Sequence, residues 1–136
     1  MNEADLPPLP SGFLPDDGLE KEIGIAEMAE RFGVSLRTLR FYEEKGLLNP
    51  RRSGRHRFYG PESRRLMAII HMCRSVGMPV DQIGELLAAL VQSRSEATST
   101  DILSRALKAR IAEIKDLAET LETQREEAGR LLRSLV

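Results

Sequence analysis

Apolar side chains recur at helical spacing through most of the chain after residue 23. In residues 25–33, IAEMAERFG, they fall on one face of a short helix that Gly33 can end in a left-handed conformation. In residues 34–46, VSLRTLRFYEEKG, Ser35 is placed to cap the first turn of a second short helix. Two short helices joined by a tight turn predict a helix-turn-helix.

The segment 49–60 interrupts this pattern with the proline, serine and glycine of NPRRSG, which are typical of a hairpin or loop. Pro61 then favours the first turn of a third helix, which Gly77 ends. A fourth helix is expected over residues 80–91, VDQIGELLAALV, and residues 92–100 are a polar break.

The last segment, residues 100–136, follows a heptad pattern, with steps of four and three that continue for about 50 Å of helix. So narrow an apolar stripe cannot be buried by one helix alone, so we expect two chains to pair in a coiled coil. Packing of the helix onto its own domain is the alternative, but it would cover only part of the stripe. Arg110 and Gln124 interrupt the stripe and could fix its register or direction. The expected dimerisation residues are Leu103, Leu107, Ile114, Leu117, Leu121, Ala128, Leu131 and Leu135.

Charge is unevenly distributed along a chain whose formal net charge is only −1. Residues 1–22 carry net −5, residues 23–75 net +6 and residues 76–136 net −2. A basic block between acidic flanks is typical of a module that binds a polyanion, although a solvated charged face would give the same totals. The densest part is RRSGRHRFY, residues 51–59, with four arginines and one histidine.

Duplex DNA is the polyanion that this pattern predicts, because a helix-turn-helix places the start of its second helix in the major groove. The candidates for base contacts are Arg37, Thr38 and either Arg40 or Phe41, depending on how that helix is rolled. The basic segment that follows would lie along the phosphate backbone as a wing, with Phe58 anchoring it on the core. Candidate phosphate contacts are Tyr42, Arg51, Arg52, Arg55, His56, Arg57 and Tyr59. His56 could contact the minor groove instead of a phosphate.

The order of these elements resembles the MerR family of transcriptional regulators. The resemblance is carried by GVSLRTLRFYEEKGLL, by RFYG, by GMPVDQIGELL and by the long heptad helix, and it covers residues 23 to about 134. It implies a winged helix-turn-helix, a second helix pair and a homodimer joined by an antiparallel coiled coil. It further implies that Arg37, Thr38 and Tyr42 contact promoter DNA, with RNA polymerase as a further partner. The residues that match the family's wing are Arg57 and Tyr59.

The chain departs from the family pattern in three places. The wing tip reads Gly-Arg-His-Arg at residues 54–57, where an Asn-Gly-Tyr-Arg sequence is usual, so His56 replaces an aromatic residue. Gly24 stands where a capping Ser or Thr is usual. Because the chain ends at Val136, we expect neither the cysteines of metal-sensing members nor the C-terminal domain of drug-sensing members.

The expected fold is all-α with a small β wing: a winged helix-turn-helix, a helix pair and a long dimerisation helix. Its expected parts are a disordered, acidic, proline-rich leader over residues 1–22, a DNA-binding domain over residues 23–95 and a coiled coil over residues 100–136. We expect a cytoplasmic, nucleoid-associated regulator that acts by distorting the spacer of a promoter. An architectural or excisionase-like DNA-binding protein is the alternative.

Enzyme chemistry is not expected, because the chain has no nucleophile–base arrangement, phosphate loop or metal-ligand spacing. No cofactor, metal or membrane is an expected partner. The adjacent acids Glu43 and Glu44 diverge by about 100° on a helix, so Glu43 is expected to pair with a nearby Arg or Lys rather than to form a catalytic pair. Cys73 has apolar neighbours at helical spacing and is expected to be a small buried residue.

Overall fold

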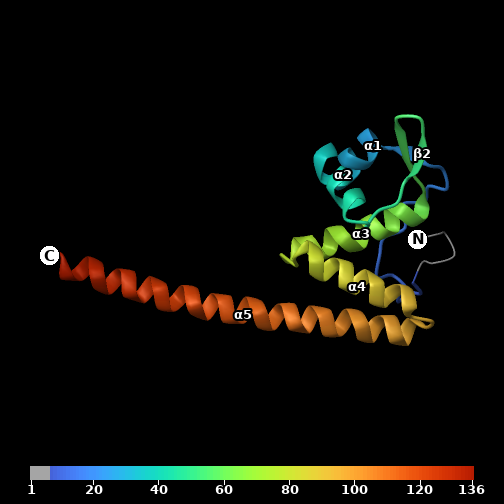
Figure 1. Cartoon of the computed structure of the whole chain (residues 1–136). Coiled ribbons are helices and arrows are strands. Elements are labelled where there is room, and N and C mark those ends of the chain that lie inside the picture. The colour runs from blue at the N-terminus through green and yellow to red at the C-terminus, as the bar shows by residue number, and fades with distance from the viewer. Residues whose placement is uncertain (1–6) are drawn as a thin grey trace. The chain divides into compact units, whose positions relative to one another are not determined.

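The structure, a computed structural model, describes residues 7–136 and is mainly helical, with one small sheet (Figure 1). The predicted fold class, all-α with a small β wing, is confirmed. The chain divides into a first unit that extends to Ile102 and a second unit over Leu103–Val136. In chain order the elements are β1 (Ile23–Gly24), α1 (Ile25–Phe32), α2 (Leu36–Glu44), β2 (Arg51–Ser53), β3 (His56–Tyr59), α3 (Pro61–Ser75), α4 (Val80–Gln92) and α5 (Glu96–Ser134).

Helices α1 and α2 form the predicted helix-turn-helix. Gly33 ends α1 with a φ of +63°, in the left-handed region that its lack of a side chain permits. Ser35 caps α2, and its Oγ accepts a hydrogen bond of 3.0 Å from the backbone N–H of Thr38. Met28 of α1 and Leu39 of α2 are both fully buried, so the apolar faces of the two helices contribute to one core.

The wing is a short antiparallel hairpin in a three-stranded sheet with the order β1-β3-β2. Ser53 pairs with His56, which leaves Gly54 and Arg55 as a two-residue turn. Gly54 has a φ of +60° and Arg55 does not have a positive φ, as a type II′ turn requires. On its other side, β3 pairs with β1 through Ile23 and Tyr59, so the wing is joined to the strand that precedes α1.

The helix pair α3 and α4 completes the core of the first unit. Pro61 opens α3 at the position predicted for it. Ile70 of α3 and Ile83 of α4 are fully buried. Cys73 is buried as well, and burial raises the pKa of its thiol, so the group stays protonated. The prediction of a small buried residue at this position is confirmed.

The described part of the leader, residues 7–22, differs from the expected disordered segment. It contains no helix or strand, but Leu9 is buried and Asp17 forms an ion pair with the buried Arg64 of α3. The physical reason is a charged partner inside the domain, which composition alone does not reveal. The part of the expectation that falls on residues 1–6 lies outside the described residues.

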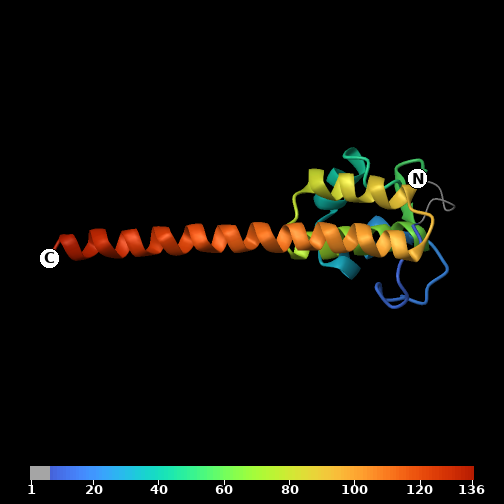
Figure 2. The same cartoon turned by 90° about the horizontal axis from the view of Figure 1, so that it is seen from below.

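Helix α5 begins earlier than expected, so the polar break is shorter than residues 92–100. Ser95 supplies the cap, since its Oγ accepts a hydrogen bond of 3.1 Å from the backbone N–H of Thr98. The buried hydroxyls of Ser93 and Ser99 lie 2.8 Å apart and satisfy each other. Figure 2 shows α5 continuing as a single uninterrupted helix.

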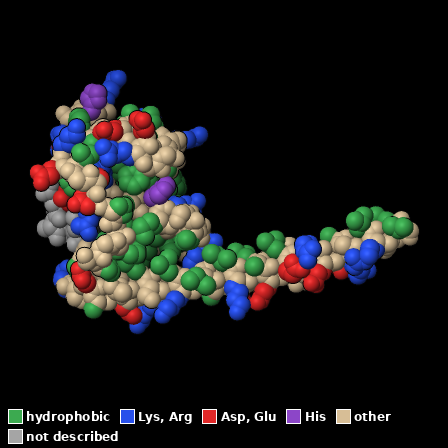
Figure 3. Space-filling model, turned by 180° about the vertical axis from the view of Figure 1, so that it is seen from behind, with side chains coloured by type: hydrophobic (Ala, Val, Ile, Leu, Met, Phe, Trp, Pro, Cys, Tyr) green, Lys and Arg blue, Asp and Glu red, His purple; other side chains and the backbone are tan. Residues whose placement is uncertain are grey.

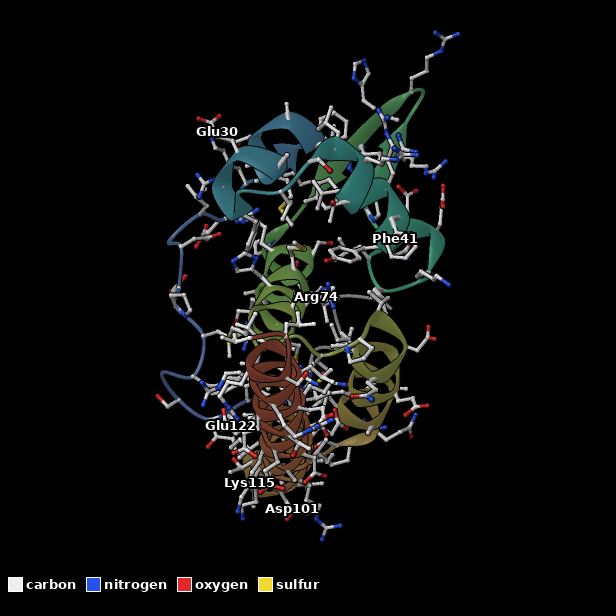
Figure 4. All side chains as sticks on the ribbon, turned by 90° about the vertical axis from the view of Figure 1, so that its left-hand side faces the viewer. Glu30, Phe41, Arg74, Asp101, Lys115 and Glu122 are labelled. Carbon is white, nitrogen blue, oxygen red and sulfur yellow. The ribbon has the colours of Figure 1, made fainter. Side chains whose placement is uncertain are left out.

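The heptad positions of α5 are largely uncovered in the single chain. Leu117 is 54% exposed and Leu121 is 65% exposed, and hydrophobic side chains follow the length of this helix in Figure 3. Leu103 is buried and Leu107 half-buried, whereas the remaining predicted dimerisation residues are exposed. Away from the seam, Glu122 (labelled in Figure 4) accepts two hydrogen bonds from Arg125, of 3.0 and 2.6 Å, on a solvent-facing surface.

Candidate nucleic-acid interface

The roll of α2 decides which of its side chains face outward. Leu39 is fully buried and Tyr42 is nearly so. The opposite face therefore presents Arg37, Arg40 and Phe41 to solvent. Because Arg40 and Phe41 are both exposed, each remains a candidate for a base contact beside Arg37. The exposed face of α2 thus combines two guanidinium groups with one aromatic ring.

Thr38 is half-buried, and the cap of α2 engages both its backbone and its side chain. Its backbone N–H donates to Ser35 Oγ, and its hydroxyl oxygen lies 2.9 Å from the same atom. A DNA contact by Thr38 would have to share that hydroxyl with the cap or use the methyl group. The contact stays a prediction. A contact by Tyr42 stays one as well, because only 5% of this residue is exposed.

The wing hairpin carries five basic side chains, four arginines and one histidine. They are Arg51, Arg52, Arg55, His56 and Arg57. Arg51 stacks over the ring of Phe58, its direct cross-strand partner, at 4.7 Å from the ring centre. Its Nε donates hydrogen bonds of 2.9 and 3.0 Å to the two carboxylate oxygens of Glu22. Arg55 occupies the tip, exposed, and has no carboxylate partner among the described residues.

Glu43 joins the wing to α2. One of its oxygens accepts a hydrogen bond from Arg52 Nη2, and the other accepts one of 2.6 Å from Arg57 Nε. The expected pairing of Glu43 with a nearby cation is therefore confirmed. Burial raises the pKa of Glu43, but the hydrogen bonds from the two arginines outweigh it, so the pKa lies below its ordinary value. The carboxylate is ionised at neutral pH and holds both guanidinium groups beside α2.

Tyr59 lies in the core rather than at the surface. It is fully buried, and its hydroxyl has no hydrogen-bond partner among the described residues. Burial raises the pKa of this hydroxyl, with a smaller contribution from the charge of Glu43, so the group is neutral. The hydroxyl is therefore not available to a phosphate in this structure, contrary to expectation. Tyr59 instead anchors the wing, and the expected anchor, Phe58, is only half-buried.

The alternation of side chains along β3 explains this exchange of roles. Successive residues of a strand face opposite sides, so Tyr59 shares a face with Arg57, and Phe58 shares the other with His56. The rings of Phe58 and His56 lie 6.3 Å apart on that outer face. His56 itself is exposed near the wing tip. Among residues 7–136 no group of three or more His, Cys, Asp or Glu residues is arranged to hold a metal ion.

Arg64 is a residue of this region that the sequence pattern did not single out. Only 3% of it is exposed, and it lies three residues before Met67 on the buried face of α3. Its Nη1 donates a hydrogen bond of 3.0 Å to the backbone carbonyl of Tyr59, at the end of the wing. An arginine at an apolar position of a helix is the signal that could have drawn attention to it.

The side chains described above lie at one end of the first unit. Figures 1 and 4 show α2 and the wing at the same end of this unit, and the Glu43 hydrogen bonds connect them directly. The exposed face of α2 and the arginines of the wing thus form a single surface. Within the described chain, no helix has the length and apolar content needed to cross a membrane.

Two family models match the chain. The first, described as MerR HTH family regulatory protein, matches residues 24–90, and the second, described as MerR, DNA binding, matches residues 64–129. The regulator HmrR of Sinorhizobium medicae is 36% identical over 108 residues, which are 74% of this chain and 72% of HmrR. CueR of Escherichia coli O6:H1 is 30% identical over 105 residues, which are 76% of each protein.

Solved structures give the same result. HiNmlR, a MerR family regulator that lacks the sensor domain and was crystallised with promoter DNA, superimposes with a TM-score of 0.53 at 25% identity, over 73% of this chain and 80% of HiNmlR. PbrR691 of Ralstonia metallidurans gives a TM-score of 0.64 at 24% identity over 82% of this chain and 86% of its own, and it supports the fold alone. The chain belongs to the MerR family of DNA-binding transcription regulators and not to a class of enzymes.

Proposed function

We propose that this protein is a homodimeric, sequence-specific regulator that binds double-stranded promoter DNA through α2 and the wing. The observation that carries the proposal is the position of Glu43, which binds two wing arginines from the recognition helix. This link makes the exposed face of α2 and the arginine-bearing hairpin one preorganised surface. Preorganised cations lose less conformational entropy when they meet phosphates.

Within that surface, Arg37 and Arg40 contact base edges in the major groove, and Thr38 and Tyr42 reach base or phosphate groups beside them. The cations of the wing bind the phosphate backbone and fix the register of α2. Tyr59 supports the wing from within the core. The wing residues assigned to phosphate contacts are Arg51, Arg52, Arg55, His56 and Arg57.

The homodimer forms through α5, in an antiparallel coiled coil. The exposed heptad residues of this helix, such as Leu117 and Leu121, support the pairing because a second copy would cover them. Two recognition helices related by a two-fold axis match a near-palindromic site. HiNmlR, which is named as a MerR regulator bound to promoter DNA, supports promoter DNA as the ligand.

The regulatory step is distortion of the promoter spacer while RNA polymerase occupies the same promoter on the nucleoid. Bending a DNA site of about 20–30 base pairs requires about 1–6 kcal/mol, which additional phosphate contacts can supply. The wing cations are where those contacts are made. The effect on transcription therefore depends on spacer length, which separates this proposal from architectural binding of DNA.

The experiment that tests the proposal begins with duplexes selected from a random pool by the full chain. Arg37→Ala should lower the ratio of specific to non-specific affinity about tenfold or more, because a bidentate contact to guanine is lost. Transcription from a bound promoter should change when its spacer is lengthened or shortened by one base pair.

Arg94→Ala is the matched control. It also removes one exposed positive charge, but from the connection between α4 and α5, which lies away from α2 and the wing (Figure 1). This variant should keep the specificity ratio of the unaltered protein. An equal fall for both variants would argue against base readout by Arg37, and selection of no sequence at all would refute the proposed function.

A further inference from the structure

A buried arginine connects the leader to the wing. Arg64 Nε donates a hydrogen bond of 2.5 Å to Asp17 Oδ2, and Nη2 donates one of 2.7 Å to the carbonyl of Leu19. Nη1 donates to two carbonyls, that of Lys21 at 2.9 Å and that of Tyr59 at 3.0 Å. One guanidinium group therefore binds three leader residues and the last residue of β3.

Water could not replace the leader residues as partners of Arg64. The Arg64 side chain is only 3% exposed, so its guanidinium group needs a counter-charge and hydrogen-bond acceptors, and removing the counter-charge leaves an uncompensated buried charge. Asp17 is the only carboxylate that bonds to Arg64 within the described chain. The hydrogen bond from Arg64 lowers the pKa of Asp17, so its carboxylate is ionised at neutral pH.

A second link runs from the leader to the opposite edge of the wing. Glu22, which directly precedes β1, binds Arg51 of β2 through two hydrogen bonds of 2.9 and 3.0 Å. Strand β3 lies between these two strands, so the link crosses the sheet. Residues 17–22 thus contact both strands of the hairpin, β3 through Arg64 and β2 through Arg51.

Apolar packing holds this stretch of the leader only weakly. Five residues from Leu14 to Leu19 line a cavity of about 460 Å³ against α1 and α3. In residues 14–22 only Leu14 and Leu19 are half-buried, and the others are exposed. The polar contacts at Arg64 and Arg51 are therefore the main attachment of the leader next to the wing. A change of one carboxylate there should alter the position of the hairpin.

We propose that leader residues 17–22 are a positioning element for the wing, in which Asp17 holds Arg64 against the Tyr59 carbonyl and Glu22 holds Arg51. The leader thereby determines how firmly the wing tip can be held against a phosphate backbone. This role rests on the proposed DNA-binding function, but its effect on the wing exists in the free protein and can be measured there.

The first test is amide hydrogen exchange of the free full chain. Asp17→Asn removes the counter-charge of Arg64, and Asp16→Asn is its matched control. Each of the two aspartates accepts a backbone hydrogen bond of 2.9 Å from two residues further on, but only Asp17 bonds to Arg64. We expect faster exchange across β2 and β3 in Asp17→Asn and wild-type exchange there in Asp16→Asn. Faster exchange confined to residues 16–22 would overturn the proposal.

The second test is a double-mutant cycle with Arg55→Ala, at the wing tip. Where the wing is well positioned, Arg55→Ala should weaken DNA binding and flatten the salt dependence by about one unit. In the Asp17→Asn background, the factor by which Arg55→Ala lowers the affinity should be smaller by about threefold or more. If Asp17→Asn caused only a general structural loss, the effects of the two changes on affinity would be multiplicative. That result would overturn the proposal.

Glu22→Gln provides a second variant, which loosens the other link without exposing a buried charge. It should raise exchange at Arg51 and at Phe58, its cross-strand partner. Unchanged exchange in this variant would contradict the role assigned to Glu22. If the protein selects no DNA sequence, the proposed function fails, while the exchange experiment still decides whether the leader positions the wing.

Discussion

At the scale of single residues, the interface depends on carboxylates as much as on arginines. Three of the four wing arginines are bonded to Glu22 or Glu43, and the fourth, Arg55, is exposed at the tip. Glu43 is the more enclosed of the two acids, with a side chain that is 12% exposed. It holds two guanidinium groups near α2 at the expense of part of their charge. The ion pairs with Glu43 thus fix the positions of Arg52 and Arg57 and partly neutralise their positive charge.

Glu43→Gln should reveal how much the ion pairs of Glu43 contribute to the free energy of unfolding, and how that contribution depends on pH. The folded-state pKa of Glu43 lies below its ordinary value, so the stabilisation is complete above the unfolded-state pKa near 4.5 and is lost as pH falls through the folded-state pKa. We expect the variant to be about 1 kcal/mol less stable at neutral pH, with the difference closing toward strongly acid pH. Urea denaturation over a range of pH measures both quantities.

Glu44→Gln serves as the control for this prediction. Glu44 is adjacent on the same helix but exposed, and no carboxylate–arginine pair is formed by it among the described residues. Its free energy of unfolding should follow that of the unaltered protein at every pH. A difference between Glu43→Gln and the unaltered protein that stays constant from neutral to acid pH would rule out the ion pairs as its cause.

Some of these residue roles were accessible from the sequence and others were not. The spacing of Gly33 and Ser35 predicts the caps that the structure contains, because capping depends on local chemistry. The roles of Phe58 and Tyr59 were predicted in reverse, because a strand of four residues does not reveal which face points inward. Arg64 depends on Asp17, a partner 47 residues away, and local pattern carries no information about such pairs.

At the scale of elements, the wing is held by its turn as well as by its anchor. Gly54 occupies the first central position of the two-residue turn with a φ of +60°. A side chain at this φ is strained even where space is open, and apart from Gly54 and its two chain neighbours no described residue has a heavy atom within 4 Å of the Cβ position. The stability lost when Gly54 is replaced therefore reports the strain of the backbone conformation and not a clash with a neighbouring residue.

Gly54→Ala should destabilise the protein by about 1 kcal/mol and weaken DNA binding, because the hairpin must change its turn. Gly84→Ala is the matched control, since Gly84 lies inside α4 and an added Cβ would be 3.5 Å from Leu47 Cδ2, an ordinary contact. That variant should gain about 0.5–1 kcal/mol through helix propensity. A denaturation midpoint of Gly54→Ala that does not fall below that of the unaltered protein would show that a side chain does not strain the turn.

The element boundaries show where sequence pattern reaches its limit. The start of α3 at Pro61 follows from the first-turn preference of proline. The start of α5 was misplaced because Ser95 and its polar neighbours resemble a linker in composition, although Ser95 is a cap. Capping residues and loop residues belong to the same few polar types, and the hydrogen bond to Thr98 distinguishes them only in three dimensions.

At the scale of the whole molecule, the long helix leaves an apolar seam that one chain does not cover. Ile114, Leu117 and Leu131 are each more than 40% exposed along a helix that otherwise carries charge. Exposed apolar rows of this length are uncommon on monomers and are typical of association surfaces. The heptad spacing predicts the exposed seam, and the identity and direction of the second helix come from the resemblance to the family.

Leu121→Glu tests the proposed association directly. Leu121 lies near the middle of the seam, so in an antiparallel pair the two copies of this position lie close to each other. Two carboxylates placed there lose their solvation and repel, and we expect dimerisation to weaken by about tenfold or more.

Thr123→Glu is the control, because Thr123 is exposed off the seam and can carry the same charge. Sedimentation should show monomers of Leu121→Glu at concentrations where Thr123→Glu is dimeric. Binding to a two-half-site duplex should fall with dimerisation, while each monomer keeps its affinity for non-specific DNA, since the wing is unaltered. A dimer of undiminished affinity in Leu121→Glu would mean that the chains associate through another surface.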